Sequence, residues 1–198
     1  MSWLTFGNDK LPSSTAIFNM GPAKTCPSRK LGLCQAYVDG KCVCYARGPE
    51  MRFPKTVLPH RQRQGRYWLS TTADNFLRRF DKARRRTTTA LRFNESGDFW
   101  GQGCVDKAET IARELAKDGI TTYLYSARSD LSYRKVRNLV VNTSGGWKKS
   151  GTRGKFIMIP KGQSAPMGAV FCPGSCKSCT RCQHGLTTYA AQHGNVSE

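Results

Sequence analysis

The chain is poor in acidic residues and lacks several features that would assign a function at once. It has 13 Asp and Glu against 32 Lys and Arg in 198 residues, a formal net charge of +19. No apolar run approaches the roughly 18 residues needed to span a membrane. The N-terminus has no basic start followed by an apolar stretch, so we expect no secretory signal. Glycine-rich phosphate loops, His-Glu-x-x-His and a Ser/His/Asp signature are absent. We therefore expect a protein that stays in a reducing cytoplasm.

Cysteine, in contrast, is abundant: the chain has nine. Thiols stay free in a reducing compartment, and clustered free thiols bind metal, whereas the odd count disfavours a framework made only of disulfides. The densest group lies in a loop over residues 171–184 with the spacing Cys-x3-Cys-x2-Cys-x2-Cys. This spacing, with a proline and a glycine in the bend, allows one tight loop to direct several sulfurs at one point. The expected ligands are Cys172, Cys176, Cys179 and Cys182.

A second, looser group lies in a loop over residues 22–46 and comprises Cys26, Cys34, Cys42 and Cys44. Two arrangements are open: each group builds its own site, or both share one site that staples the ends of the chain together. Cys104 stands alone and is expected to be a small buried core residue. The three histidines are scattered, and only His184 follows a cysteine closely enough to be a spare ligand.

Soft thiolates suit both iron–sulfur clusters and zinc. The C-terminal run is similar to the bacterial iron–sulfur pattern read in the opposite direction. Its subset Cys172, Cys176, Cys179 also has the Cys-x3-Cys-x2-Cys spacing of radical-SAM enzymes, although those carry the motif near the start of a barrel. We expect a [4Fe–4S] cluster, with zinc as the alternative.

Positive charge is concentrated between residues 52 and 92, where twelve Lys and Arg face two acids. Nucleic acid is the expected partner, and an acidic protein or a merely solvated face are the alternatives. A basic amphipathic helix from Thr72 to about Arg86 and a basic loop at 144–154 carry most of the expected contacts. These are Arg78, Arg79, Lys82, Arg84, Arg85, Arg86, Trp147, Lys148, Lys149 and Arg153.

The hydrophobic pattern predicts one α/β domain over residues 1–198. Strands are expected at 15–20, 88–93, 120–125, 139–142 and 155–159, and further helices at 102–118 and 130–137. Residues 52–70 are expected to be ordered only by packing on neighbours. This alternation implies a parallel sheet with crossover helices, as a partial or small barrel or as an open sheet. Metal would staple the two cysteine loops to it.

Ligands bind at the carboxyl ends of parallel strands. Two such ends carry Glu95, Asp98 and Arg128, which we take as candidate catalytic residues. Helix capping by Ser96, Asp98 and Asp130 is the competing interpretation.

Several stretches together resemble a phage family known as gene product 88. They are Gly7-Asn8-Asp9-Lys10-Leu11, Lys24-Thr25-Cys26-Pro27, Cys34, Cys44-Tyr45-Ala46, the runs 92–99 and 125–129, and the run from Cys172 to Cys182. The element Cys-Tyr-Ala is also similar to phage proteins that are distantly radical-SAM-like. The resemblance implies that every metal candidate except Cys42 matches the family pattern, that Asp98 matters, and that the protein belongs in a bacterial host cytoplasm.

Three hypotheses follow. The leading one is a phage iron–sulfur protein with a basic nucleic-acid-binding surface. A rival is an enzyme in which a cluster with an open iron position performs redox or radical chemistry on a nucleic acid or small molecule. The third is a zinc-stapled module that binds an acidic host protein.

Overall fold

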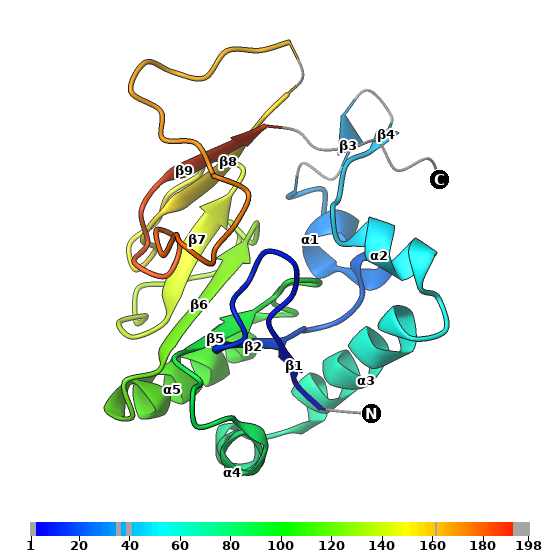
Figure 1. Cartoon of the computed structure of the whole chain (residues 1–198), viewed down its shortest axis with the longest axis vertical. Helices are drawn as coiled ribbons and strands as arrows, with labels where there is room; N and C mark the ends of the chain where they lie inside the picture. Colours follow the sequence, from blue (N-terminus) through cyan, green and yellow to red (C-terminus); the bar gives the residue numbers. More distant parts are fainter. Residues whose placement is uncertain (1–2, 35–36, 39–40, 161, 192–198) are drawn as a thin grey trace.

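The computed structural model describes residues 3–34, 37–38, 41–160 and 162–191 (Figure 1). Seven strands form one sheet in the order β1-β2-β5-β6-β7-β8-β9. β1 pairs with β2 antiparallel and every other pair is parallel. The strands are β1 Thr5–Phe6, β2 Thr15–Phe18, β5 Ala90–Phe93, β6 Thr121–Ser126, β7 Val140–Ser144, β8 Lys155–Ile159 and β9 Thr188–Ala191.

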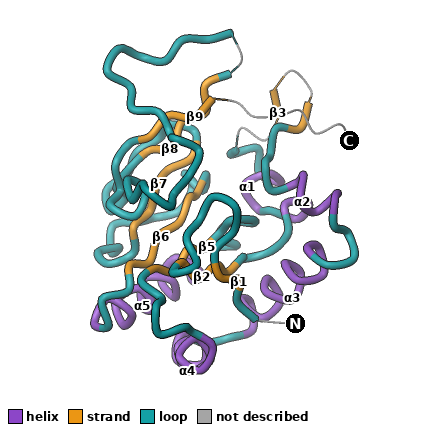
Figure 2. The backbone as a smooth tube through the Cα atoms, in the orientation of Figure 1, coloured by secondary structure: helices purple, strands orange, loops and turns teal. Residues whose placement is uncertain are grey.

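β1 and β9 are the two edges of the sheet among the described residues, so the α/β class with a mostly parallel sheet is confirmed and a closed barrel is excluded. Two helices, α3 (Val57–Ser70) and α4 (Ala73–Ala83), connect β2 to β5, and α5 (Gln102–Lys117) connects β5 to β6. Loops make the later connections (Figure 2). The segment between β2 and α3 holds η1 (Ala23–Thr25), α1 (Pro27–Lys30), α2 (Arg47–Arg52) and a small hairpin of β3 (Tyr37–Val38) and β4 (Lys41–Cys42).

The three long helices pack on one face of the sheet. Phe18, Leu91 and Phe93 from the strands join Phe76 of α4 and Ile111 of α5 in a single buried cluster. Cys104 lies in this cluster and is 9% exposed, as expected. No helix in the described part of the chain is long and apolar enough to cross a membrane.

Two expected elements differ from the structure. The prediction of a helix at 130–137 is wrong, because this segment forms turns and bends. The hydroxyl of Tyr133 is buried there and donates to the carbonyl of Arg128 at 3.0 Å, which competes with a helical backbone pattern. The basic helix ends at Ala83 rather than near Arg86, because Arg84 adopts an extended backbone (ψ 149°). Its side chain pairs with Asp81 and Asp118 at 2.8 and 2.9 Å.

Helix α3 was not expected from the sequence, in which residues 52–70 were predicted to be ordered only by packing on neighbours. The buried residues of this helix are Arg61, Gln64, Gly65 and Trp68, which recur at helical spacing. Three of the four are not apolar, so the stripe is invisible to a pattern that counts hydrophobic residues. Gly65 is required where the helix crosses β2's end, because a Cβ there would lie 2.9 Å from the Cα of Gly21.

The opposite face of the sheet, which we call the loop face, is covered by loops. The N-terminal loop at 7–14 meets the C-terminal cysteine loop there, where the Cys176 amide donates to the Lys10 carbonyl at 2.7 Å. Figure 1 shows both loops in front of the strands. Because alternate strand residues point to opposite faces, the side chains beside Leu91 and Val141 in sequence, Arg92 and Asn142, belong to this loop face.

Candidate metal centre on the loop face

An aromatic and cationic row crosses the loop face beneath the C-terminal cysteine loop. The guanidinium carbon of Arg92 lies 5.1 Å from the centre of the Tyr125 ring. Tyr125 in turn contacts Phe156 and Tyr123, with ring centroids 5.1 and 6.5 Å apart. These residues come from β5, β6 and β8, so the row spans β7, which lies between β6 and β8 in the sheet.

The C-terminal cysteine loop packs on this row through specific contacts. The side chains of Tyr125 and Thr188 form hydrogen bonds with the thiol of Cys182. The amide of Asn142 donates to the Cys182 carbonyl at 2.8 Å. At the other end of the loop, the Cys172 amide donates to the Tyr189 carbonyl at 2.7 Å. The loop is therefore held to β6, β7 and β9 rather than projecting freely.

Two thiols of the C-terminal loop, those of Cys176 and Cys182, have raised pKa values. Burial raises the pKa of Cys176, Arg92 opposes that change, and Cys182, Cys172 and Cys179 raise the pKa further. Burial also raises the pKa of Cys182, against the hydrogen bonds from Tyr125 and Thr188. Two thiols of this loop, Cys176 and Cys182, therefore lie close enough to Arg92 to be influenced by the same cation.

Among the described residues, Cys26, Cys104, Cys172, Cys176, Cys179 and Cys182 are free thiols. In the described ranges, no three His, Cys, Asp or Glu side chains form a group that could hold a metal ion. His184, the expected spare ligand, is exposed. The donor set fits a thiolate-bound metal or cluster in its chemistry, and the C-terminal loop has to close further for its sulfurs to reach one centre.

Among the N-terminal cysteines, Cys26 lies near Asp98, which follows the carboxyl end of β5. Cys26 precedes α1, whose first residue is Pro27. Its pKa is raised to about 12, first by burial, then by Asp98, with a smaller contribution from Cys34. Cys44 is half-buried next to Tyr45. The backbone of Cys42 belongs to β4, but its side chain is outside the described residues.

Asp98 is a buried carboxylate that the surrounding residues satisfy completely. It accepts hydrogen bonds from the Ser28 hydroxyl, the Ser126 hydroxyl at 2.8 Å, and the amides of Phe99 and Ala127 at 2.8 and 2.9 Å. Burial raises its pKa, and these four donors oppose that change. Asp98 therefore joins the segment after Cys26 to the end of β6, which is a positioning role.

The guanidinium of Arg128 is likewise held by hydrogen bonds to other residues of the protein. Its Nε and Nη2 donate to the two carboxylate oxygens of Asp130 at 2.8 and 2.7 Å, and its Nη1 donates to the Phe99 carbonyl. The fold thus brings Asp98 and Arg128 to one rim, as the strand ends suggested, but both are occupied with structural contacts. Glu95 is the third candidate, and its side chain is still 21% exposed.

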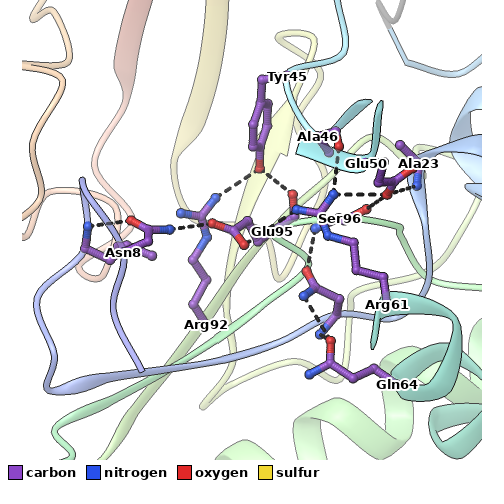
Figure 3. Close-up of polar contacts among 12 residues, drawn as sticks. Asn8, Ala23, Tyr45, Ala46, Glu50, Arg61, Gln64, Arg92, Glu95 and Ser96 are labelled. Atoms are coloured by element: carbon purple, nitrogen blue, oxygen red, sulfur yellow. Dashed lines mark hydrogen bonds and ion pairs between the residues drawn. The ribbon is translucent and has the colours of Figure 1, made fainter. Parts of the chain in front are cut away.

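Glu95 and Arg92 lie at the junction between the two cysteine groups (Figure 3). The Tyr45 hydroxyl accepts a hydrogen bond from Arg92 Nη2 at 3.1 Å and donates to the Glu95 carbonyl at 2.8 Å. The amide of Asn8 donates to Glu95 Oε1 at 2.6 Å, while its oxygen accepts from the amides of Lys10 and Leu11. The resemblance motif at 7–11 is therefore a turn that fastens the N-terminal loop to this junction.

Arg92 connects the two groups electrostatically. It donates to Tyr45, which follows Cys44 in the chain, and it lowers the pKa of both Cys176 and Cys182. Its Nε is buried without a hydrogen-bond partner among the described residues.

A second buried network was not expected from the sequence (Figure 3). Glu50 Oε1 accepts from Arg61 Nη1 at 3.0 Å, from the Ala23 amide at 2.8 Å and from the Ser96 hydroxyl at 3.0 Å. Arg61 also donates to the Ala46 carbonyl at 2.7 Å. The network ties both ends of the N-terminal cysteine loop to the strand ends. One signal existed in the sequence: Glu50 is the only acid between Asp39 and Asp74.

The expected nucleic-acid contacts fall in different environments. Arg78, Arg79 and Lys82 are exposed along α4, and Arg86 is exposed after it. Arg84 is neutralised by the two acids described above, and Arg85 lies 4.5 Å from the centre of the Phe6 ring.

The loop at 144–154 presents less aromatic surface than the sequence suggested. The Trp147 ring packs against Tyr133, with centroids 5.6 Å apart, and belongs to the margin of the core. Lys148 and Lys149 are exposed, and Arg153 donates to the Arg137 carbonyl at 2.9 Å.

A family model described as gene product 88 matches residues 3–171. The match includes the N-terminal cysteines and ends one residue before Cys172, so the C-terminal cysteine run lies beyond it. No curated protein and no solved structure matches the chain.

Proposed function

Because the chain belongs to the gene product 88 family, a phage-type family, we propose that it is a phage iron–sulfur protein with a basic nucleic-acid-binding surface. It would act in the cytoplasm of an infected bacterium. The observation that supports this proposal is the packing of the loop with Cys172, Cys176, Cys179 and Cys182 on the loop face, where Asn142 binds the Cys182 carbonyl and the amides of Cys172 and Cys176 donate to Tyr189 and Lys10.

Four free thiols within eleven residues form a donor set suited to a [4Fe–4S] cluster, with zinc as the alternative. When bound, such a cluster supplies a one-electron redox centre. Arg92 would offset the negative charge of the thiolates, and the Tyr125 hydroxyl would orient Cys182. The aromatic row of Tyr123, Tyr125 and Phe156 would shield the sulfurs from water on the sheet side.

The N-terminal group is proposed as a separate site. Asp98 and Cys34 raise the pKa of Cys26, whereas the other C-terminal thiols raise the pKa of Cys176. Because each group of cysteines acts on its own members, we favour two separate sites over one shared set of ligands. The hydrogen bond between Arg92 and Tyr45 connects the two sites.

The enzymatic alternative is favoured by one observation at the same junction. Asn94 adopts a left-handed backbone (φ 56°), and both polar atoms of its buried amide are without a partner in the described residues. Strain and unsatisfied groups gather at functional sites. Glu95 is the candidate that would contact a substrate, because its side chain is 21% exposed, although it accepts from Asn8 at 2.6 Å and lies 3.7 Å from Arg61 Nη2.

The test is anaerobic purification followed by a visible spectrum and analysis of iron, sulfide and zinc. We expect a brown protein with about four irons per cluster, and loss of the C-terminal cluster's iron and sulfide in Cys176→Ser. Cys104→Ala is the matched control, because this cysteine is buried in the helical core and should leave the iron content unchanged. Stoichiometric zinc without colour would overturn the redox role and leave a zinc-stapled module that binds nucleic acid or an acidic protein.

A further inference from the structure

A depression of about 440 Å³ lies where α3 ends and α4 begins. Its walls combine polar side chains from the end of α3 with cations from α4. Tyr67 and Asn75 join the walls, since the Tyr67 hydroxyl donates to the Asn75 carbonyl at 3.3 Å. The lining residues are Tyr67, Ser70, Thr71, Asn75, Arg78, Arg79 and Lys82.

The depression contains three cations and no acid. Arg78 donates to the side-chain oxygen of Asn75, which holds its guanidinium over the opening. The Arg79 guanidinium is fixed over the rings of Trp3 and Tyr67, 4.9 and 4.7 Å from their centres. Lys82 has no acidic partner in the described part of the chain. Two of the three cations are thus held in place before any ligand arrives.

The adjacent cations differ in this respect. Arg84 forms ion pairs with Asp81 and Asp118, and the Arg85 guanidinium stacks on the Phe6 ring. The basic surface of α4 is therefore uneven, and its unneutralised part coincides with the depression.

We propose that this depression is a phosphate-binding site through which the backbone of a nucleic acid is held, independent of base sequence. Arg78, Arg79 and Lys82 would contact phosphate oxygens, and the Ser70 hydroxyl would add a neutral donor. Contacts to phosphates position a nucleic acid and carry no sequence information themselves. This inference rests on the nucleic-acid half of the proposed function and not on the cluster.

The experiment measures binding of the full-length protein to short labelled oligonucleotides of mixed sequence, single-stranded and duplex, across a salt series. The test variant is Arg78→Gln with Lys82→Gln, which spares the stacked Arg79 and so the packing of Trp3. The control is Arg134→Gln with Lys135→Gln, which removes the same charge from exposed positions elsewhere. A second comparison is Lys148→Gln with Lys149→Gln, in the competing basic loop.

We expect the test variant to bind about tenfold or more weakly. Its plot of log affinity against log salt should be shallower by up to about 2 units on duplex and about 1.4 on single strands. The control should keep the parent's salt slope. Equal losses in test and control, or a larger loss in the Lys148/Lys149 variant, would overturn the phosphate site while leaving nucleic-acid binding in place. No binding by the parent at low salt would overturn both, and the spectrum of the same sample reports the cluster separately.

Discussion

Breaking the buried ion pair between Glu50 and Arg61 should loosen the N-terminal cysteine loop. Their side chains are 1% and 5% exposed, with Nη1 and Oε1 3.0 Å apart. Removing one member of such a pair leaves the other charge buried, at a cost of about 3–5 kcal/mol. In Arg61→Met the buried charge of Glu50 loses its only cationic partner among the described residues. The donors that remain, the Ala23 amide and the Ser96 hydroxyl, are neutral, so they offset only a small part of this cost.

For a chain of this length, about 3–5 kcal/mol corresponds to a fall in the thermal unfolding midpoint of about 6–20 °C. The assay is thermal unfolding at a fixed metal content, with iron analysis of the folded protein. The double variant Glu50→Met with Arg61→Met should lose less than the sum of the single variants, because no unpaired charge then remains buried.

The matched control is Lys117→Gln, which breaks an exposed pair with Glu114 on α5 and should leave the midpoint unchanged. If Arg61→Met unfolds within about 1 kcal/mol of the parent, the pair does not hold the loop and the reasoning fails.

Three further changes test other parts of the structure. Gly65→Ala should lower the free energy of unfolding in urea by about 1–3 kcal/mol, because the added Cβ meets the backbone of Gly21. The control Gly103→Ala adds its Cβ in open space on α5 and should raise the free energy of unfolding by up to about 1 kcal/mol. Equal effects of the two substitutions would refute the close contact at Gly65. Burial lowers the pKa of His60, aided by nearby arginines, so its contribution to stability is present above pH 6.5 and is lost as pH falls through the lower folded pKa. His60→Gln should remove this loss, which is below about 1 kcal/mol for a partly exposed group, and unchanged acid sensitivity would contradict it. Arg92→Gln should lower the reduction potential of the bound cluster, because a nearby cation stabilises the more negative reduced state. A potentiometric titration measures this change. An unchanged potential would show that Arg92 does not act on the cluster.

Local pattern located four strands and one helix in the second half of the chain, although it missed β9 and predicted a helix at 130–137 that does not form. The strands at 88–93, 120–125, 139–142 and 155–159 and the helix at 102–118 all exist within a few residues of their expected bounds. Their periodicity is apolar, and apolar burial is the main driving force for packing. The same pattern is uninformative where burial is polar, which is why α3, with its stripe of Arg61, Gln64, Gly65 and Trp68, was missed.

The sequence alone determined the chemistry that the protein carries: two groups of cysteines, a large excess of positive charge, and an α/β core whose strand ends bear polar residues. Only the tertiary structure decided how these are used. It supplied Asp98 and Arg128 with hydrogen-bonding partners, several of them far away in sequence, and it neutralised Arg84 while leaving Arg78 and Lys82 unpaired with acids in the described residues. It also placed Arg92 between the two cysteine groups. The physical reason is that hydrogen bonds and ion pairs between residues far apart in sequence leave no local periodicity, so their partners are set by which strands and loops the fold brings together.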